Sequence, residues 1–340
     1  MDTATRKRTI AILRALDKAG RPLGATQLVR ELEVIGVDVS QRTVRYYLAA
    51  MDSNGLTRRC GKRGREITSL GSEELANAFV AEKVGFVSAK VDELSCQMTF
   101  EPRRCRGTII LNVSTVPADQ LGDALHEVKA TFEAGLGMGR YAVVGHPGQA
   151  LDRLRVPDGR FAIGTVCSLT INGILLSAGV PAASRFGGLL EMDDGRPVRF
   201  TEMIRYDGSS LDPLEIFISG HMTRVREAVQ TGRGIIGAGM REIPAVAVSK
   251  VRKLCEKLEA IGLGGVIAVG KPNRPLLEVP VPEGRAGLVV AGGLNPLAAA
   301  REAGVNTHNK ALTGLFEFEQ LVEFGQLDSL VSTPPAPRGT

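Results

Sequence analysis

The stretch from Val156 to Arg160 reads VPDGR, and it recurs as VPEGR from Val281 to Arg285. Further matches stand in the same order on either side of this pair. The triplet Gly-Leu-Gly at 135–137, for example, returns at 262–264. The offset between matching residues is 127 at the triplets and 125 at the later pair. Ordered matches at a nearly constant offset predict an internal duplication.

The two repeats extend over about 107–192 and 234–318, and both predict the same order of elements. Expected strands lie at 107–113, 140–145 and 161–169 in the first repeat, and at 234–240, 265–270 and 286–292 in the second. Expected helices lie at 118–134 and 170–178, and at 245–260 and 295–303. This pattern predicts a duplicated α/β domain whose sheet is covered by helices. We expect a ligand-binding cleft between the two halves.

The residues before this body predict a winged helix-turn-helix. Helical spacing of apolar residues indicates helices over Thr5–Ala19 and Ala25–Val34. Ser40 is a typical N-cap for a third helix, which ends near Asn54-Gly55. On that third helix Val44, Leu48 and Met51 form the inward face, with Tyr47 beside them. Its outward face carries Gln41, Arg42, Arg45 and Tyr46, the residue types with which such helices read base edges.

The segment from Leu56 to Thr68 predicts a β-wing with a glycine-punctuated tip. Its candidate phosphate contacts are the cations Arg59, Lys62, Arg63 and Arg65. Two alternatives stay open, because winged helices also bind proteins and also occur in ribonucleases. Cations on both the third helix and the wing favour double-stranded DNA.

Charge separates this head from the body. Residues 1–70 hold 14 Lys and Arg against 7 Asp and Glu, whereas residues 71–340 hold 28 against 30. The predicted domains are therefore a DNA-binding head at 1–70, a connector at 71–100, an effector-binding and dimerisation body at 101–330, and a disordered tail at 331–340. In the connector, Ser72 is the expected start of a helix that continues to Lys83, and residues 86–100 fit either a helix or a strand.

Several protein classes are disfavoured by what the sequence lacks. It has no apolar run long enough to cross a bilayer, and its start is not that of a signal peptide. The five cysteines are odd in number and scattered, so we expect reduced thiols in a cytoplasmic protein without a membrane partner. The four histidines show no metal-ligand spacing, and we expect neither a metal nor a cofactor.

Small polar residues follow the third strand of the first repeat. Cys167, Ser168 and Asn172 stand at a predicted helix start, with Arg185 downstream. Helix starts and guanidinium groups favour carboxylates and phosphates, which makes these residues candidate effector ligands. The alternative is that the polar residues are helix caps and that Arg185 forms a structural ion pair. The segment 205–218 belongs to neither repeat, ends in an expected apolar strand at 216–218, and is a candidate for closing the cleft or forming a dimer interface.

An enzyme is the alternative function class. It would act on a small anionic metabolite and carry the winged helix as a regulatory head. Cys167 is its candidate nucleophile, but no base is placed beside it by sequence, and small cysteines on strands are usually inert. We therefore expect no enzymatic activity.

Four motifs carry a family resemblance when they are taken together with the head and the duplication: Ile163–Ser168 (IGTVCS), Arg185–Gly188 (RFGG), Ser210–Phe217 (SLDPLEIF) and Arg241–Pro244 (REIP). Over about residues 5–325 the chain resembles the archaeal nitrogen regulatory repressors of the NrpR family. The resemblance implies a dimeric repressor of nitrogen-assimilation genes, bound to a palindromic operator and released by 2-oxoglutarate. Family members often carry two regulatory domains in tandem, whereas this chain has one.

Residues and resemblance together suggest one mechanism. The head binds the operator, and a dicarboxylate binds in the body through Ser168, Asn172, Arg185 and Arg241. Binding would shift the two heads of the homodimer, so that they no longer match half-sites about 34 Å apart. A useful effector needs only about 1–3 kcal/mol of coupling between the two sites.

Overall fold

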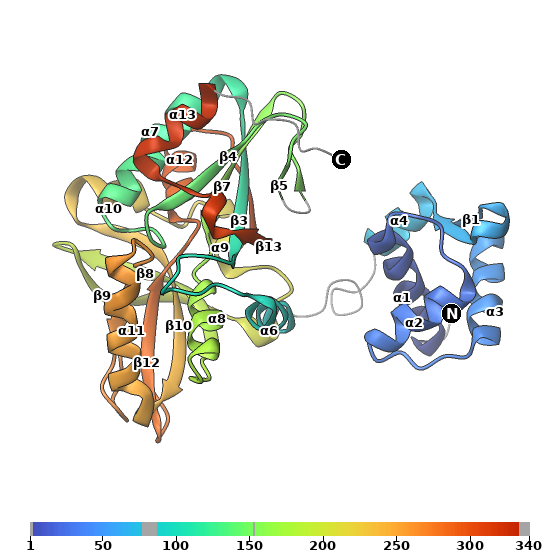
Figure 1. The fold of residues 1–340 in the computed structure, drawn as a ribbon, viewed down its shortest axis with the longest axis horizontal. Coiled ribbons are helices and arrows are strands. Elements are labelled where there is room, and N and C mark those ends of the chain that lie inside the picture. The colour runs from blue at the N-terminus through green and yellow to red at the C-terminus, as the bar shows by residue number, and fades with distance from the viewer. Residues whose placement is uncertain (1–2, 77–86, 152–153, 333–340) are drawn as a thin grey trace. The chain divides into compact units, whose positions relative to one another are not determined.

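The computed structural model describes residues 3–76, 87–151 and 154–332, and it divides the chain into two compact units, Met1–Gly85 and Phe86–Thr340 (Figure 1). The expected connector at 71–100 is shared between them. Its first part belongs to helix α4 (Ser69–Ala76) of the head, and its last part forms helix α6 (Val87–Gln97), which packs against the body. Within the range 86–100, residues 87–97 are thus helical, which decides between the two alternatives.

The first unit is a winged helix-turn-helix, as predicted. Its elements are α1 (Thr3–Ala19), α2 (Ala25–Val34), α3 (Gln41–Ser53), β1 (Thr57–Arg59), a 3₁₀ turn η1 (Gly61–Arg63) and β2 (Arg65–Ile67). Apolar side chains of the three helices form one core, with Ile10, Leu28 and Leu48 fully buried. Because β1 and β2 pair antiparallel, the wing projects as a hairpin.

Glycine is required at one point of the wing. Gly64 has φ +114°, and a Cβ atom there would lie 2.1 Å from the backbone oxygen of Leu23. The close approach lets Leu23 pair with Arg65 in an additional β-bridge. The expected start of a helix at Ser72 is wrong, because α4 begins three residues earlier at Ser69, and residues 77–83 lie outside the described residues.

The second unit contains two five-stranded sheets in which every pairing is antiparallel. The first sheet has the order β13-β3-β7-β4-β14, with β13 (His308–Glu317), β3 (Thr108–Pro117), β7 (Arg160–Val166), β4 (Tyr141–Gly145) and β14 (Val322–Glu323). The second has the order β11-β12-β10-β8-β9, with β11 (Val266–Val269), β12 (Arg285–Ala291), β10 (Gly234–Pro244), β8 (Ala183–Asp193) and β9 (Arg196–Arg205).

Each repeat contributes its last strand to the sheet of the other. Strand β8 ends the first repeat and pairs with β10 of the second, whereas β13 ends the second repeat and pairs with β3 of the first. Both crossing strands contain a bulge, so the exchange is pseudo-symmetric. The duplication was predicted, but the exchange of strands was not.

Helices cover the sheets on faces set by the alternation of side chains. In β4, Ala142 and Val144 face one apolar cluster with α7 (Leu121–Glu133), α12 (Asn295–Glu302) and α13 (Leu327–Ser332), whereas Val143 faces a second, larger cluster. The remaining helices are α8 (Thr170–Ser177), α9 (Pro213–Ser219), α10 (Val225–Thr231) and α11 (Val248–Ala260), and a short hairpin pairs β5 (Ala150–Leu151) with β6 (Leu154–Arg155) (Figure 1).

Two predictions at the borders of the repeats need correction. Residues 216–218 lie in helix α9 and not in a strand, because Asp212 accepts a hydrogen bond from the Leu214 backbone at 2.9 Å and Pro213 starts the helix. The tail was expected to be disordered from 331, but Val331 and Ser332 still belong to α13. Residues 333–340 lie outside the described residues.

Candidate functional site

The exposed face of α3 carries the four side chains that the sequence assigned to base contacts. Gln41, Arg42, Arg45 and Tyr46 are all exposed, and the Tyr46 side chain is 73% accessible. The opposite face is buried at Val44, Tyr47, Leu48 and Met51. Ser40 caps the helix by accepting a hydrogen bond from the Thr43 backbone at 3.1 Å. The helix is therefore anchored on one side and exposed on the side that carries donors, where Gln41 Nε2 donates a hydrogen bond to Thr26 Oγ1 of α2.

The wing cations fall into two groups. Arg59, Lys62 and Arg63 are exposed at or beside the tip. Arg65 instead lies 2.7 Å from the Asp52 carboxylate, and its side chain is only 22% exposed. This ion pair ties the wing to the end of α3, so Arg65 is placed as a support for the hairpin.

In the body, Arg241 joins the candidate ligands into one buried cluster. Its Nε donates to Asn172 Oδ1 at 2.8 Å, and its Nη2 donates to the backbone oxygen of Ser168 at 2.9 Å and to Ser168 Oγ at 3.1 Å. Asn172 Nδ2 in turn donates to Ser184 Oγ at 2.8 Å. The cluster thus connects α8 of the first repeat with β10 of the second.

Arg241 is only 1% exposed, and this burial lowers the pKa of its guanidinium. Among the residues that the structure describes, no carboxylate oxygen lies within 4.0 Å of its nitrogen atoms. A buried charge without a counter-ion is expensive, because the protein interior solvates ions poorly. The electrostatics of the cluster therefore favour an anion beside this guanidinium.

Glycines make room for this arginine. A Cβ atom at Gly239 would lie 3.0 Å from Arg241 Nη1 and 3.6 Å from the Tyr206 hydroxyl. Gly187 pairs with Gly239 on the neighbouring strand, and a Cβ atom there would lie 3.2 Å from the same hydroxyl. The Gly-Gly pair thus leaves the space into which a guanidinium and a phenol project from different elements.

Arg185 lies beside the cluster but is engaged elsewhere. It sits at the bulge of β8, and its Nε lies 3.2 Å from the carboxylate of Glu242. Glu242 is 7% exposed, so the pair is half-buried, and the ion-pair alternative describes its state here.

Cys167 is buried beside Ser168, and burial raises the pKa of its thiol to about 12. A thiol with such a pKa stays protonated at neutral pH and is a poor nucleophile. This placement gives no support to a catalytic cysteine.

Sequence reasoning missed Tyr206 and Asp212, which come from the segment between the repeats. Both are buried, and desolvation raises the pKa of each, to about 7 for Asp212. The one available signal was Asp212-Pro213, the N-cap and first residue of α9. Tyr206 had no local signal, because only the tertiary structure brings it to Arg241.

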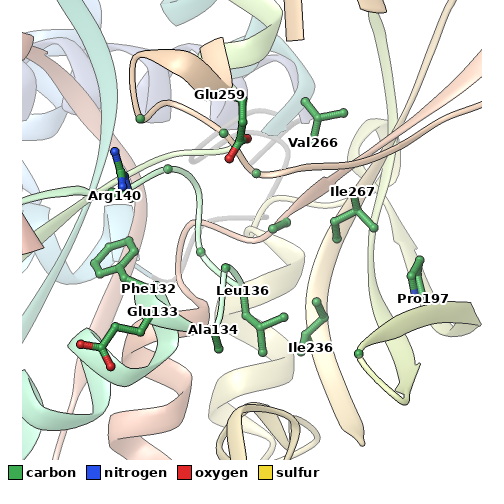
Figure 2. A pocket seen from close by; sticks show the side chains of 18 of the residues that line it. Phe132, Glu133, Ala134, Leu136, Arg140, Pro197, Ile236, Glu259, Val266 and Ile267 are labelled. Carbon is green, nitrogen blue, oxygen red and sulfur yellow. The ribbon is translucent and has the colours of Figure 1, made fainter. Parts of the chain in front are cut away.

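A separate cavity of about 440 Å³ lies where the two Gly-Leu-Gly turns meet (Figure 2). Its charged lining residues are Glu133, Arg140 and Glu259. Helices α7 and α11 end at this cavity, and helix C-termini carry partial negative charge. Two carboxylates against one guanidinium make it a poor site for a dianion.

No helix in the described part of the chain is long and apolar enough to cross a membrane. No group of three or more His, Cys, Asp or Glu side chains in 3–76, 87–151 and 154–332 is arranged to hold a metal ion.

An exposed polar face on α3, a basic wing and a duplicated body with a buried polar cluster are the features of a winged-helix regulator. Family models match both parts: the ribonuclease R winged-helix domain over residues 10–75, and the NrpR regulatory domains 1 and 2 over residues 84–323. The chain therefore belongs to the NrpR family.

Named relatives agree. The chain is 32% identical to the global nitrogen regulator NrpRI of Methanosarcina mazei, over 95% of this chain and 99% of that protein. It is 30% identical to the global nitrogen regulator NrpR of Methanococcus maripaludis, over 92% of this chain and 54% of that protein, so it spans about half of that relative. These relatives are named as regulators and not as enzymes.

One solved structure has the same fold as the body. It is a crystal structure of a nitrogen repressor-like protein from Methanococcus jannaschii, with a TM-score of 0.61 and 28% sequence identity. The match covers 71% of this chain and 99% of the other.

Proposed function

We propose that the chain is a homodimeric transcriptional repressor of nitrogen-assimilation genes, which binds a palindromic DNA operator and is released by 2-oxoglutarate. The winged-helix head and the relatives named as global nitrogen regulators support the regulatory part. The single observation that carries the effector part is the buried guanidinium of Arg241 without a carboxylate partner among the described residues.

In the proposed DNA complex, the exposed face of α3 lies in the major groove. Arg42 and Arg45 supply the guanidinium groups that read guanine, and Gln41 supplies an amide for adenine. The exposed wing cations Arg59, Lys62 and Arg63 then reach phosphates. Arg65 contributes indirectly by holding the wing through Asp52.

In the proposed effector complex, a carboxylate of 2-oxoglutarate takes the place of some protein acceptors at Arg241. A carboxylate accepts two parallel hydrogen bonds from a guanidinium, and such ion pairs are stronger than the bonds that Arg241 makes to the neutral oxygens of Ser168. Ser168 and Asn172 then bind the remaining polar atoms, and Arg185 exchanges its ion pair with Glu242 for the second carboxylate.

The position of the cluster links binding to movement. Arg241 belongs to the second repeat, whereas Ser168 and Asn172 belong to the first. Because the cluster is closed in the structure, a ligand can enter only if the two repeats separate locally. We propose that this displacement of the two repeats changes the positions of the DNA-binding heads in the dimer.

The direct test is an operator titration with and without effector. Wild-type protein should bind a palindrome from a nitrogen-gene promoter, and millimolar 2-oxoglutarate should weaken that binding. Arg42→Ala should weaken binding by about 1–3 kcal/mol, because it removes a base contact.

Arg103→Ala removes the same charge from an exposed position in the body and is the matched control. Undiminished affinity of Arg42→Ala would remove α3 as the recognition helix. Operator binding that does not change with 2-oxoglutarate would rule out this effector.

A further inference from the structure

The two repeats differ in what covers the second strand of each repeat, β4 in the first and β11 in the second. In the first repeat, strand β4 is covered by the segment 318–332, which follows the second repeat. There β14 pairs with β4 through Val322 and Ala142, and α13 packs against β4 as well. Phe324 also stacks on Phe132 of α7, with ring centroids 5.7 Å apart. A strand and a helix together therefore close this side.

The equivalent side of the second repeat is open in the described chain. Strand β11 is the last strand of its sheet, and all four of its residues, Val266–Val269, are only half-buried. Between β11 and helix α11 runs a groove of about 340 Å³. An apolar edge strand beside an open groove is a surface that a second strand can pair with.

We propose that this groove is the interface with a second copy of the chain. The proposal rests on the homodimer of the proposed function and assigns its contact surface. A two-fold axis perpendicular to the second sheet would set β11 antiparallel to the partner's β11 and α11 antiparallel to the partner's α11. The second copy thereby supplies a strand and a helix, the same two elements that close the first repeat.

The charged side chains of α11 support a second copy of the chain as the partner in this groove. Apart from the buried Leu258, the helix residues that line the groove are Arg252, Cys255, Glu256 and Glu259, which lie at i, i+3, i+4 and i+7 on one stripe. An axis that passes between Cys255 and Glu256 places Arg252 of each copy opposite the partner's Glu259. The stripe is therefore complementary to itself in the antiparallel arrangement.

Figure 2 shows how Glu259, Val266 and Ile267 lie around the turn that joins α11 to β11. Glu259 has no ion-pair partner among the residues the structure describes. Arg252 bonds only to the backbone oxygen of Val269 there, at 2.7 Å. Both side chains are exposed in one copy, so Arg252 of each copy can pair with Glu259 of the other.

A charge swap tests the interface in the full-length protein by sedimentation equilibrium. Arg252→Glu and Glu259→Arg should each raise the dimer dissociation constant about tenfold or more, because like charges then face each other. The double variant restores opposite charges and should return to within about threefold of wild type. Lys253→Glu changes the same charge on the same helix but outside the groove lining, and it should leave association unchanged.

A thiol cross-link gives a second readout. Cys255 lies next to the proposed axis, so a short bis-maleimide should link two chains in wild type and fail to do so in Cys255→Ser. Cys96→Ser, at an exposed cysteine of α6, should still cross-link. Single variants that dimerise like wild type, or cross-linking that persists in Cys255→Ser, would overturn the interface while leaving the repressor proposal intact. A wild type that dimerises here but binds no palindrome would instead overturn the repressor proposal alone.

Discussion

The two repeats of the body share a sequence pattern and an order of elements, yet they differ at equivalent positions. Arg241 on β10 stands where the first repeat has Ser114 on β3, at the offset of 127 residues. Arg241 connects the two repeats through Asn172 and Ser168. Ser114 is also buried, but its hydroxyl has no hydrogen-bond partner in the described structure. The two repeats therefore have the same order of elements, but only the second has a cation, Arg241, at this position.

The neighbourhoods of these positions differ in the same way. On β3, the strand that carries Ser114, the nearby Asn112 side chain accepts a hydrogen bond from the Leu312 backbone at 3.1 Å. Around Arg241 the polar atoms are joined to a charge that the described chain does not neutralise. The two equivalent positions therefore differ in charge, and the proposed effector site lies at the charged one.

The largest effect is expected where the first repeat is closed. Leu327 of α13 is fully buried, and Leu327→Ala should lower the free energy of unfolding by about 2–5 kcal/mol. Leu254 of α11 is only half-buried, so Leu254→Ala should destabilise clearly less. Urea denaturation at equal protein concentration measures both. Equal losses would show that the two sides are closed to the same degree.

The next effect concerns the cationic position. Arg241→Met removes the guanidinium, and binding of 2-oxoglutarate should weaken by about 1.5–3 kcal/mol, the contribution typical of a hydrogen bond to a charged group. Ser114→Ala changes the equivalent position and should leave binding unchanged. The increase in melting temperature at millimolar 2-oxoglutarate reports both. If Arg241→Met keeps the full increase, the effector binds elsewhere.

The smallest effect is a pH dependence of stability, which should differ between the segments that follow the first and the second repeat. The segment after β8 buries Asp212, whose pKa is raised to about 7, whereas the segment after β13 keeps Glu319, Glu323 and Asp328 exposed. An acid whose pKa is raised on folding binds its proton more tightly in the folded state. Stability is then lost as pH rises from the unfolded pKa near 4 toward 7.

Between pH 5 and 6 the contribution of Asp212 should fall by at most about 1.4 kcal/mol. Asp212→Asn keeps the helix cap without the titration, so its stability should depend less on pH over this range. Urea midpoints at the two pH values compare the variants. A wild-type midpoint that does not drop more than that of Asp212→Asn would contradict the raised pKa.

Local features were predictable from the sequence. Ser40, the apolar stripe of α3 and the pair Asn54-Gly55 fixed the recognition helix, because capping and helical spacing act within a few residues. Pro213 after Asp212 carries an equally local signal for α9, whereas the apolar run at 216–218 predicts a strand and is wrong. Short apolar runs fit both kinds of element, so length and caps had to decide.

The sequence by itself determined the winged helix, the duplication and most of the residues of the buried cluster. The tertiary structure decided that β8 and β13 exchange between the repeats, that Arg65 pairs with Asp52, and that Arg241 meets Ser168 and Tyr206. The reason is physical. Helix caps and periodicity are set by neighbours in the chain, whereas strand partners and buried charge pairs depend on contacts between residues far apart in sequence.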